Sequence, residues 1–112
     1  MAKILHVEDD RDDQHIFGSI LKAGGHTVVA VEKISHAIEV LSGSRFDLVI
    51  CDGTLEQEED GLRWAEQIRR EGRKVVVLTN FARSEIVTCL LKIDAQFKTG
   101  YLQAEVEKAL AA

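Results

Sequence analysis

A chain of 112 residues is long enough for one hydrophobic core and too short for two, so we expect a single domain over residues 1–112. Hydrophobic residues make up 46% of the chain and charged residues 29%, which is typical of a folded globular protein and excludes a disordered or fibrous one. The net charge of −5 argues against direct nucleic-acid binding, and the absence of an apolar run of roughly 20 residues argues against a membrane span. We therefore expect a cytoplasmic domain.

The first half of the chain alternates β-type runs with helical patterns. Short runs rich in Val, Ile and Leu favour strands, whereas apolar residues that recur every three or four positions favour helices. Glycines after the helical patterns mark where the helices end. Asp12 and Asp13 suit the positive N-terminal end of the first helix. These rules predict strands over residues 3–7, 27–31 and 46–52, separated by helices that end before Gly24 and at Gly43.

The second half continues the alternation after an acidic loop over residues 53–59. The unbroken aliphatic run 74–78 is typical of a strand that is covered on both faces. Apolar and polar residues alternate over 93–97, which favours a last short strand ending at Lys98. Helices are expected over residues 61–70, 84–91 and 102–111.

Five strands that alternate with five helices predict an α/β fold built from right-handed βαβ units. At this length we expect a flavodoxin-like three-layer (βα)5 sandwich with a parallel sheet of order 2-1-3-4-5. Strands 1, 3, 4 and 5 are neighbours in this order, and their carboxyl ends meet at one edge. The polar residues at those ends should therefore converge, and they are Glu8, Asp9, Asp52, Thr79 and Lys98.

The residue types in this group indicate phosphoryl chemistry. Two carboxylates about 4 Å apart repel each other by roughly 4 kcal/mol at an effective dielectric constant near 20, so a proton or a cation must lie among them. Oxygen ligands without Cys or His favour Mg²⁺. In such a site Asp52 would be the nucleophile, Lys98 and Mg²⁺ would neutralise the phosphoryl oxygens, and the Thr79 hydroxyl would donate a hydrogen bond to one of them.

The chain resembles the receiver domain of two-component response regulators over nearly its whole length. The segment ILHVEDD is similar to the acidic N-terminal motif of that family, and FDLVICDG is similar to its phosphoacceptor strand. EDGL resembles the opening of its third helix, VVVLTN its Thr/Ser strand, and FKT its lysine strand. Four motifs in the family order are far more specific than any one of them.

The resemblance implies a role for each residue of the group. Asp52 would be the phosphorylation site, with Thr79 as the switch hydroxyl and Lys98 as the family's lysine. Mg²⁺ would be held by Asp9, Asp52 and the backbone carbonyl of Thr54, with Glu8 acting through water.

The resemblance also implies partners for the domain. A histidine kinase or phosphotransfer protein would supply the phosphoryl group, and an output protein or effector domain would read the result. The domain would be a signalling phosphoacceptor and not an enzyme, at most catalysing its own phosphorylation and dephosphorylation.

Two departures from the family pattern leave a rival interpretation. Proline usually follows the family's lysine after a cis bond, whereas Thr99 follows Lys98 and the chain has no proline, so we expect a trans bond. The segment from Thr79 to Lys98 is a few residues shorter than in the family, and the position three residues before the lysine, where the family usually has an aromatic residue, is Ala95. The rival is a degenerate receiver that binds proteins without phosphorylation. A Mg²⁺-dependent phosphatase is disfavoured because Thr54, and not a second acid, lies two positions after Asp52.

Overall fold

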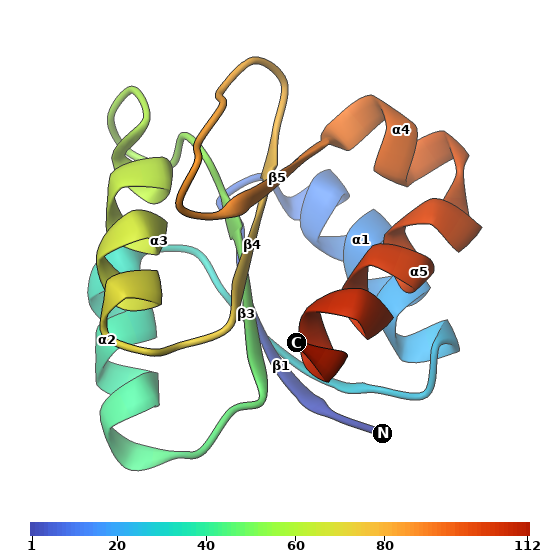
Figure 1. Cartoon of the computed structure of the whole chain (residues 1–112), viewed down its shortest axis with the longest axis horizontal. Coiled ribbons are helices and arrows are strands. Elements are labelled where there is room, and N and C mark those ends of the chain that lie inside the picture. The colour runs from blue at the N-terminus through green and yellow to red at the C-terminus, as the bar shows by residue number, and fades with distance from the viewer.

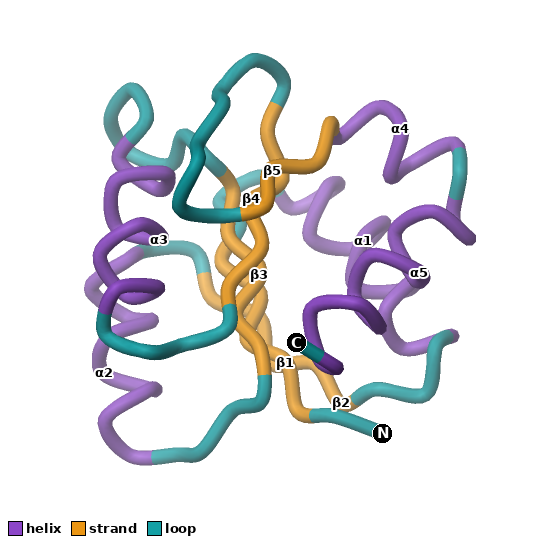
Figure 2. The backbone as a smooth tube through the Cα atoms, in the orientation of Figure 1, coloured by secondary structure: helices purple, strands orange, loops and turns teal.

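A five-stranded parallel sheet forms the centre of the computed structural model, which describes residues 1–112 (Figures 1 and 2). The strand order is β2-β1-β3-β4-β5, which confirms the predicted flavodoxin-like order. The strands are β1 (Lys3–Val7), β2 (Thr27–Val31), β3 (Leu48–Asp52), β4 (Val75–Thr79) and β5 (Thr88–Leu91). The helices are α1 (Arg11–Ala23), α2 (Ile34–Gly43), α3 (Asp60–Arg70), α4 (Lys92–Phe97) and α5 (Thr99–Ala111).

Helices cover both faces of the sheet (Figure 1). The helices α2 and α3 lie on one face, and α1, α4 and α5 lie on the other. Alternate residues of β3 pack into the core on opposite faces of the sheet, because successive side chains of a strand point to opposite faces. Val49 and Cys51 pack on the side of α3, whereas Leu48 and Ile50 pack on the side of α1 and α5. None of the helices has both the length and the apolar character needed to span a membrane.

The first three strands and first three helices lie close to their predicted positions. The start of α1 shows how the sequence sets a boundary: the Asp10 carboxylate accepts a hydrogen bond from the Asp13 backbone N–H at 2.9 Å and caps the helix. This cap orients the first turn of α1 beside the end of β1.

The predictions of a helix over residues 84–91 and of a strand over 93–97 are wrong. Residues 80–87 form a loop, β5 follows at Thr88–Leu91, and α4 begins at Lys92 (Figure 2). The Ser84 hydroxyl accepts hydrogen bonds from the N–H groups of Ile86 and Val87 at 3.0 and 3.3 Å, and the chain bends there and enters β5 at Thr88 without forming a helix. The chain thus has five helices, but none lies between β4 and β5. No peptide bond is cis, as expected from the absence of proline.

Candidate functional site

The strands β1, β3, β4 and β5 end at the upper edge of the sheet in Figure 1. Polar side chains gather at these ends. Glu8 follows β1, Asp52 is the last residue of β3, and Thr79 is the last residue of β4. The strands run in parallel register, with Val7 opposite Cys51 and Asp52 opposite Leu78, so these ends stand side by side. The site is therefore a product of parallel topology acting on residues far apart in the chain.

Three carboxylates come together at this edge. Oxygen atoms of Glu8, Asp9 and Asp52 lie within 4.8 Å of one another. Glu8 is fully buried and Asp52 is 9% exposed, whereas Asp9 is open to solvent. A set of oxygen donors with one open side fits a hard divalent cation that keeps part of its water shell, which is the habit of Mg²⁺. The donor set therefore suits the metal that the sequence predicts.

The cation within the site is Lys92. Its Nζ donates to Glu8 Oε1 at 2.8 Å, to Asp52 Oδ2 at 2.9 Å and to Asp13 Oδ2 at 3.0 Å. Lys92 directly follows β5, whose pairing with β4 carries it to the same edge as Asp52. Sequence reasoning missed both Lys92 and Asp13. One available signal was that Lys92 ends an apolar run, residues 89–91, just as the acids end theirs.

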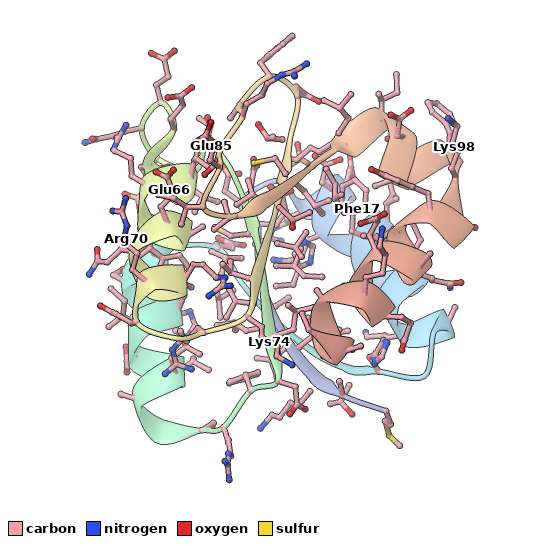
Figure 3. All side chains as sticks on the ribbon, viewed as in Figure 1. Phe17, Glu66, Arg70, Lys74, Glu85 and Lys98 are labelled. Atoms are coloured by element: carbon pink, nitrogen blue, oxygen red, sulfur yellow. The ribbon has the colours of Figure 1, made fainter.

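The expectation that Lys98 joins this group is wrong. Lys98 lies at the junction of α4 and α5, at the outer edge of the molecule in Figure 3. Its side chain is 70% exposed, and its nearest carboxylate is Asp94 at 3.7 Å. The alternation over 93–97 belongs to a helix in which only Ala95 is buried, so the chain has turned away from the sheet before Lys98.

Burial and charge set the protonation of the site. Burial raises the pKa of Glu8 to about 8, the hydrogen bond from Lys92 opposes this shift, and the nearby Asp52 carboxylate adds to it. Burial works to lower the pKa of Lys92, but the hydrogen bonds to Asp52 and Glu8 outweigh it, so this pKa lies above its ordinary value. Lys92 therefore stays charged, and burial favours the protonated form of Glu8 unless a cation neutralises its carboxylate.

Thr79 packs against the backbone that follows Asp52. Its side chain is nearly buried, and a Cβ atom added at Gly53 would lie 2.9 Å from its Oγ1. Only glycine at position 53 allows this approach without displacing the hydroxyl. Thr79 Oγ1 also accepts the Ala82 N–H at 3.4 Å. The structure thus brings Thr79 to the same edge as the carboxylates, as the topology predicts.

Asp60 organises the acidic loop between β3 and α3. Its carboxylate accepts hydrogen bonds from three backbone N–H groups at 2.8 to 3.1 Å, those of Leu55, Glu56 and Gln57. Burial works to raise the pKa of Asp60, but these bonds outweigh it and the pKa is lowered. Asp60 therefore ties the start of α3 to the loop beside the site, while the other loop acids, Glu56, Glu58 and Glu59, are exposed to solvent.

Backbone contacts fix Asp52 from the side of α3. The Thr54 N–H donates to Asp52 Oδ1 at 3.2 Å. A Cβ atom at Gly61 would lie 1.8 Å from the Asp52 carbonyl oxygen, so α3 begins in direct contact with the end of β3. This contact gives a physical reason for the glycine in the EDGL segment. The proposed metal contact of the Thr54 backbone carbonyl stays a prediction.

Comparison with known proteins gives one consistent family. The family model for the response regulator receiver domain matches residues 4–103. The transcriptional regulatory protein ZraR of Escherichia coli K12 is 32% identical over 116 residues, covering 96% of this chain and 26% of ZraR. Protein Rrf1 of Nitratidesulfovibrio vulgaris is 29% identical over 115 residues, covering 98% of this chain and 83% of Rrf1. The chain thus spans about a quarter of the length of ZraR.

Solved structures support the same fold. The response regulator TrrA of Thermotoga maritima, in complex with Mg²⁺-BeF, has a TM-score of 0.84 at 24% identity, covering 97% of this chain and 99% of that chain. A complex of the histidine kinase ThkA with TrrA matches with a TM-score of 0.82 at 24% identity, covering 98% of this chain and 99% of that chain. At this level of identity the likeness is evidence for the architecture.

Proposed function

Because the chain belongs to the response regulator receiver domain family, we propose that it is a phosphoacceptor in a two-component phosphorelay, with residues 1–112 as one receiver. Asp52 is the residue that takes the phosphoryl group. The observation that carries this proposal is the arrangement around Asp52, where carboxylate oxygens lie within 4.8 Å of one another and an ammonium group lies 2.9 Å from Oδ2. Lys92 takes the role that the sequence suggested for Lys98.

Each residue of the site has its own part in the transfer of the phosphoryl group to Asp52. A carboxylate oxygen of Asp52 attacks the phosphorus atom, the bond from phosphorus to the donor imidazole nitrogen breaks, and that imidazole takes up a proton. Lys92 stays charged and stabilises the phosphoryl oxygens, and the Thr79 hydroxyl donates a hydrogen bond to one of them. Glu8, Asp9, Asp52 and the carbonyl of Thr54 would hold Mg²⁺, which supplies further charge neutralisation at those oxygens.

The proposed partners follow from this chemistry. A histidine kinase or phosphotransfer protein donates the phosphoryl group, and the matched complex of ThkA with TrrA is a kinase–regulator pair. An output protein or effector domain reads the surface that changes when charge is added at Asp52. The proposal places the domain in the cytoplasm, without direct contact to nucleic acid or membrane, and limits its catalysis to its own phosphorylation and dephosphorylation.

A degenerate receiver that acts without phosphate is the alternative. Two observations favour it: β4 and β5 are joined by a loop without a helix, and all three Lys92 donors are already bound to carboxylates. The occupied Lys92 donors would slow the entry of a phosphoryl group, because one contact must break first.

Intact-protein mass spectrometry after incubation with Mg²⁺ and phosphoramidate separates the two functions. We expect a mass gain of one phosphoryl group in the wild type and none in Asp52→Asn, which keeps the shape of the side chain but not its nucleophile. Removal of Mg²⁺ with a chelator should prevent the gain. An unmodified wild type, or an equal gain in Asp52→Asn, would support the phosphorylation-independent module.

A further inference from the structure

We propose that Asp13 is a positioning residue of this site, which holds the Lys92 ammonium on the side of α1 and competes with the phosphoryl group for it. This inference rests on the proposed function and assigns a role to a residue outside the set expected from the sequence.

Lys92 has no donor left for a new acceptor. A lysine ammonium carries three N–H donors. In this structure they are directed to Glu8, Asp13 and Asp52, at 2.8 to 3.0 Å. A phosphoryl oxygen on Asp52 therefore gains a Lys92 donor only when one of these three hydrogen bonds breaks and that N–H turns to the phosphoryl oxygen.

The three partners differ in their freedom to leave. The Glu8 side chain has no exposure to solvent, and Asp52 is the proposed acceptor, with 11% of its side chain exposed. Asp13 is 28% exposed, so it is the partner that can turn toward water without leaving a buried charge. Its backbone is held by the cap of α1, where its N–H donates to Asp10 at 2.9 Å. Asp13 thus links the start of α1 to the lysine that follows β5.

The charge of Asp13 opposes phosphorylation. A carboxylate that becomes an acyl phosphate gains about one negative charge. The bound oxygens of Asp13 and Asp52 share one nitrogen, so they lie within about 6 Å of each other, where unit charges at a partly exposed site interact appreciably. Asp13 also takes up one donor of the cation that would neutralise the new charge. Removal of its charge should therefore favour the phosphorylated form.

Asp13→Asn tests this role, with Asp12→Asn as the matched control. Asp12 lies in the same first turn of α1, carries the same charge and is exposed, and it has no contact with Lys92. The probe is beryllofluoride at a fixed Mg²⁺ concentration, followed by fluorine NMR. We expect Asp13→Asn to tighten its binding about fivefold and Asp12→Asn to change it less than twofold. Acylation of Lys92, measured by peptide mass spectrometry in the metal-free protein, should also be faster in Asp13→Asn, with exposed Lys98 as the internal reference.

The results distinguish a failure of the proposed role of Asp13 from a failure of the proposed phosphoacceptor function. Unchanged or weaker binding in Asp13→Asn, or equal tightening in Asp12→Asn, would overturn the competition. Unchanged acylation of Lys92 would overturn the positioning role. A wild type that binds no beryllofluoride would contradict the proposed phosphoacceptor function and the competition with it, while the acylation measurement would still decide whether Asp13 holds Lys92.

Discussion

His6 should make the stability of this domain sensitive to mild acid. It is the fourth of the five residues of β1, and its side chain is fully buried, with the ring edge-to-face against Phe17 at a centroid distance of 6.4 Å. Neither ring nitrogen has a hydrogen-bond partner. Burial lowers the pKa of His6 to about 4, and the charge of Lys92 adds to the shift, while the carboxylates of Asp52 and Asp13 oppose it.

The sign and size of the effect follow from the two pKa values. Below pH 6.5 the unfolded chain binds a proton at His6 and the folded chain does not, so the free energy of unfolding falls as the pH falls. The loss begins near pH 6.5 and levels off near pH 4, where the folded form is protonated too. One pKa unit corresponds to 1.36 kcal/mol, so His6 alone should remove about 2 kcal/mol between pH 7.5 and pH 5.0.

Urea unfolding at these two pH values in a chelating buffer measures the effect. We expect His6→Leu to lose about 2 kcal/mol less than the wild type on acidification, because leucine does not titrate. His36→Leu, which removes an exposed imidazole, should follow the wild type. The reasoning would be refuted by equal losses in the wild type and in His6→Leu. The difference between variants is needed because Glu8 acts in the opposite direction: its raised pKa makes the folded form bind the extra proton between pH 4.5 and about 8.

Three further predictions concern the site. Lys92→Met should slow phosphorylation by phosphoramidate at least about tenfold, because the charge that stabilises the phosphoryl oxygens is lost. Lys98→Met should leave the rate unchanged, and equal effects of the two substitutions would contradict the assignment of Lys92. The affinity for Mg²⁺, measured by calorimetry, should rise with pH up to about pH 8, because metal binding expels the Glu8 proton. Glu8→Gln should remove most of this pH dependence, and an equally steep dependence in that variant would show that the proton comes from another group. Gly61→Ala should lower the free energy of unfolding by about 2 kcal/mol or more, because the added Cβ would overlap the Asp52 carbonyl. Gly100→Ala should leave the free energy of unfolding unchanged, because no atom lies within 4 Å of the added Cβ. Similar thermal midpoints for the two variants would rule out the overlap.

Much of the fold could be predicted because the signals are local. The aliphatic runs of β1, β3 and β4 and the glycines at the ends of the first two helices act within a few residues. Short connections between the elements then leave few possible topologies. The carboxyl ends of β1 and β3 carry the acids directly, so the meeting of Glu8, Asp9 and Asp52 followed from strand order alone. The same holds for Thr79 at the end of β4.

The end of the chain could not be predicted in the same way. The stretch 84–97 contains apolar residues that fit either a helix or a strand, and periodicity alone does not decide between them. The tertiary structure decides: pairing with β4 makes a strand of Thr88–Leu91, and Ala95 is buried as part of α4.

The sequence by itself therefore determined which acids and which hydroxyl meet at one edge of the sheet, because Asp52 and Thr79 end their own strands and Glu8 and Asp9 directly follow theirs. Only the tertiary structure decided which cation joins them, because that depends on where β5 lies against β4 and on how far α1 brings Asp13. Both are long-range contacts, with 40 residues separating Lys92 from Asp52 and 79 separating it from Asp13. No local pattern encodes such a distance, and so Lys92 was visible only once the chain was folded.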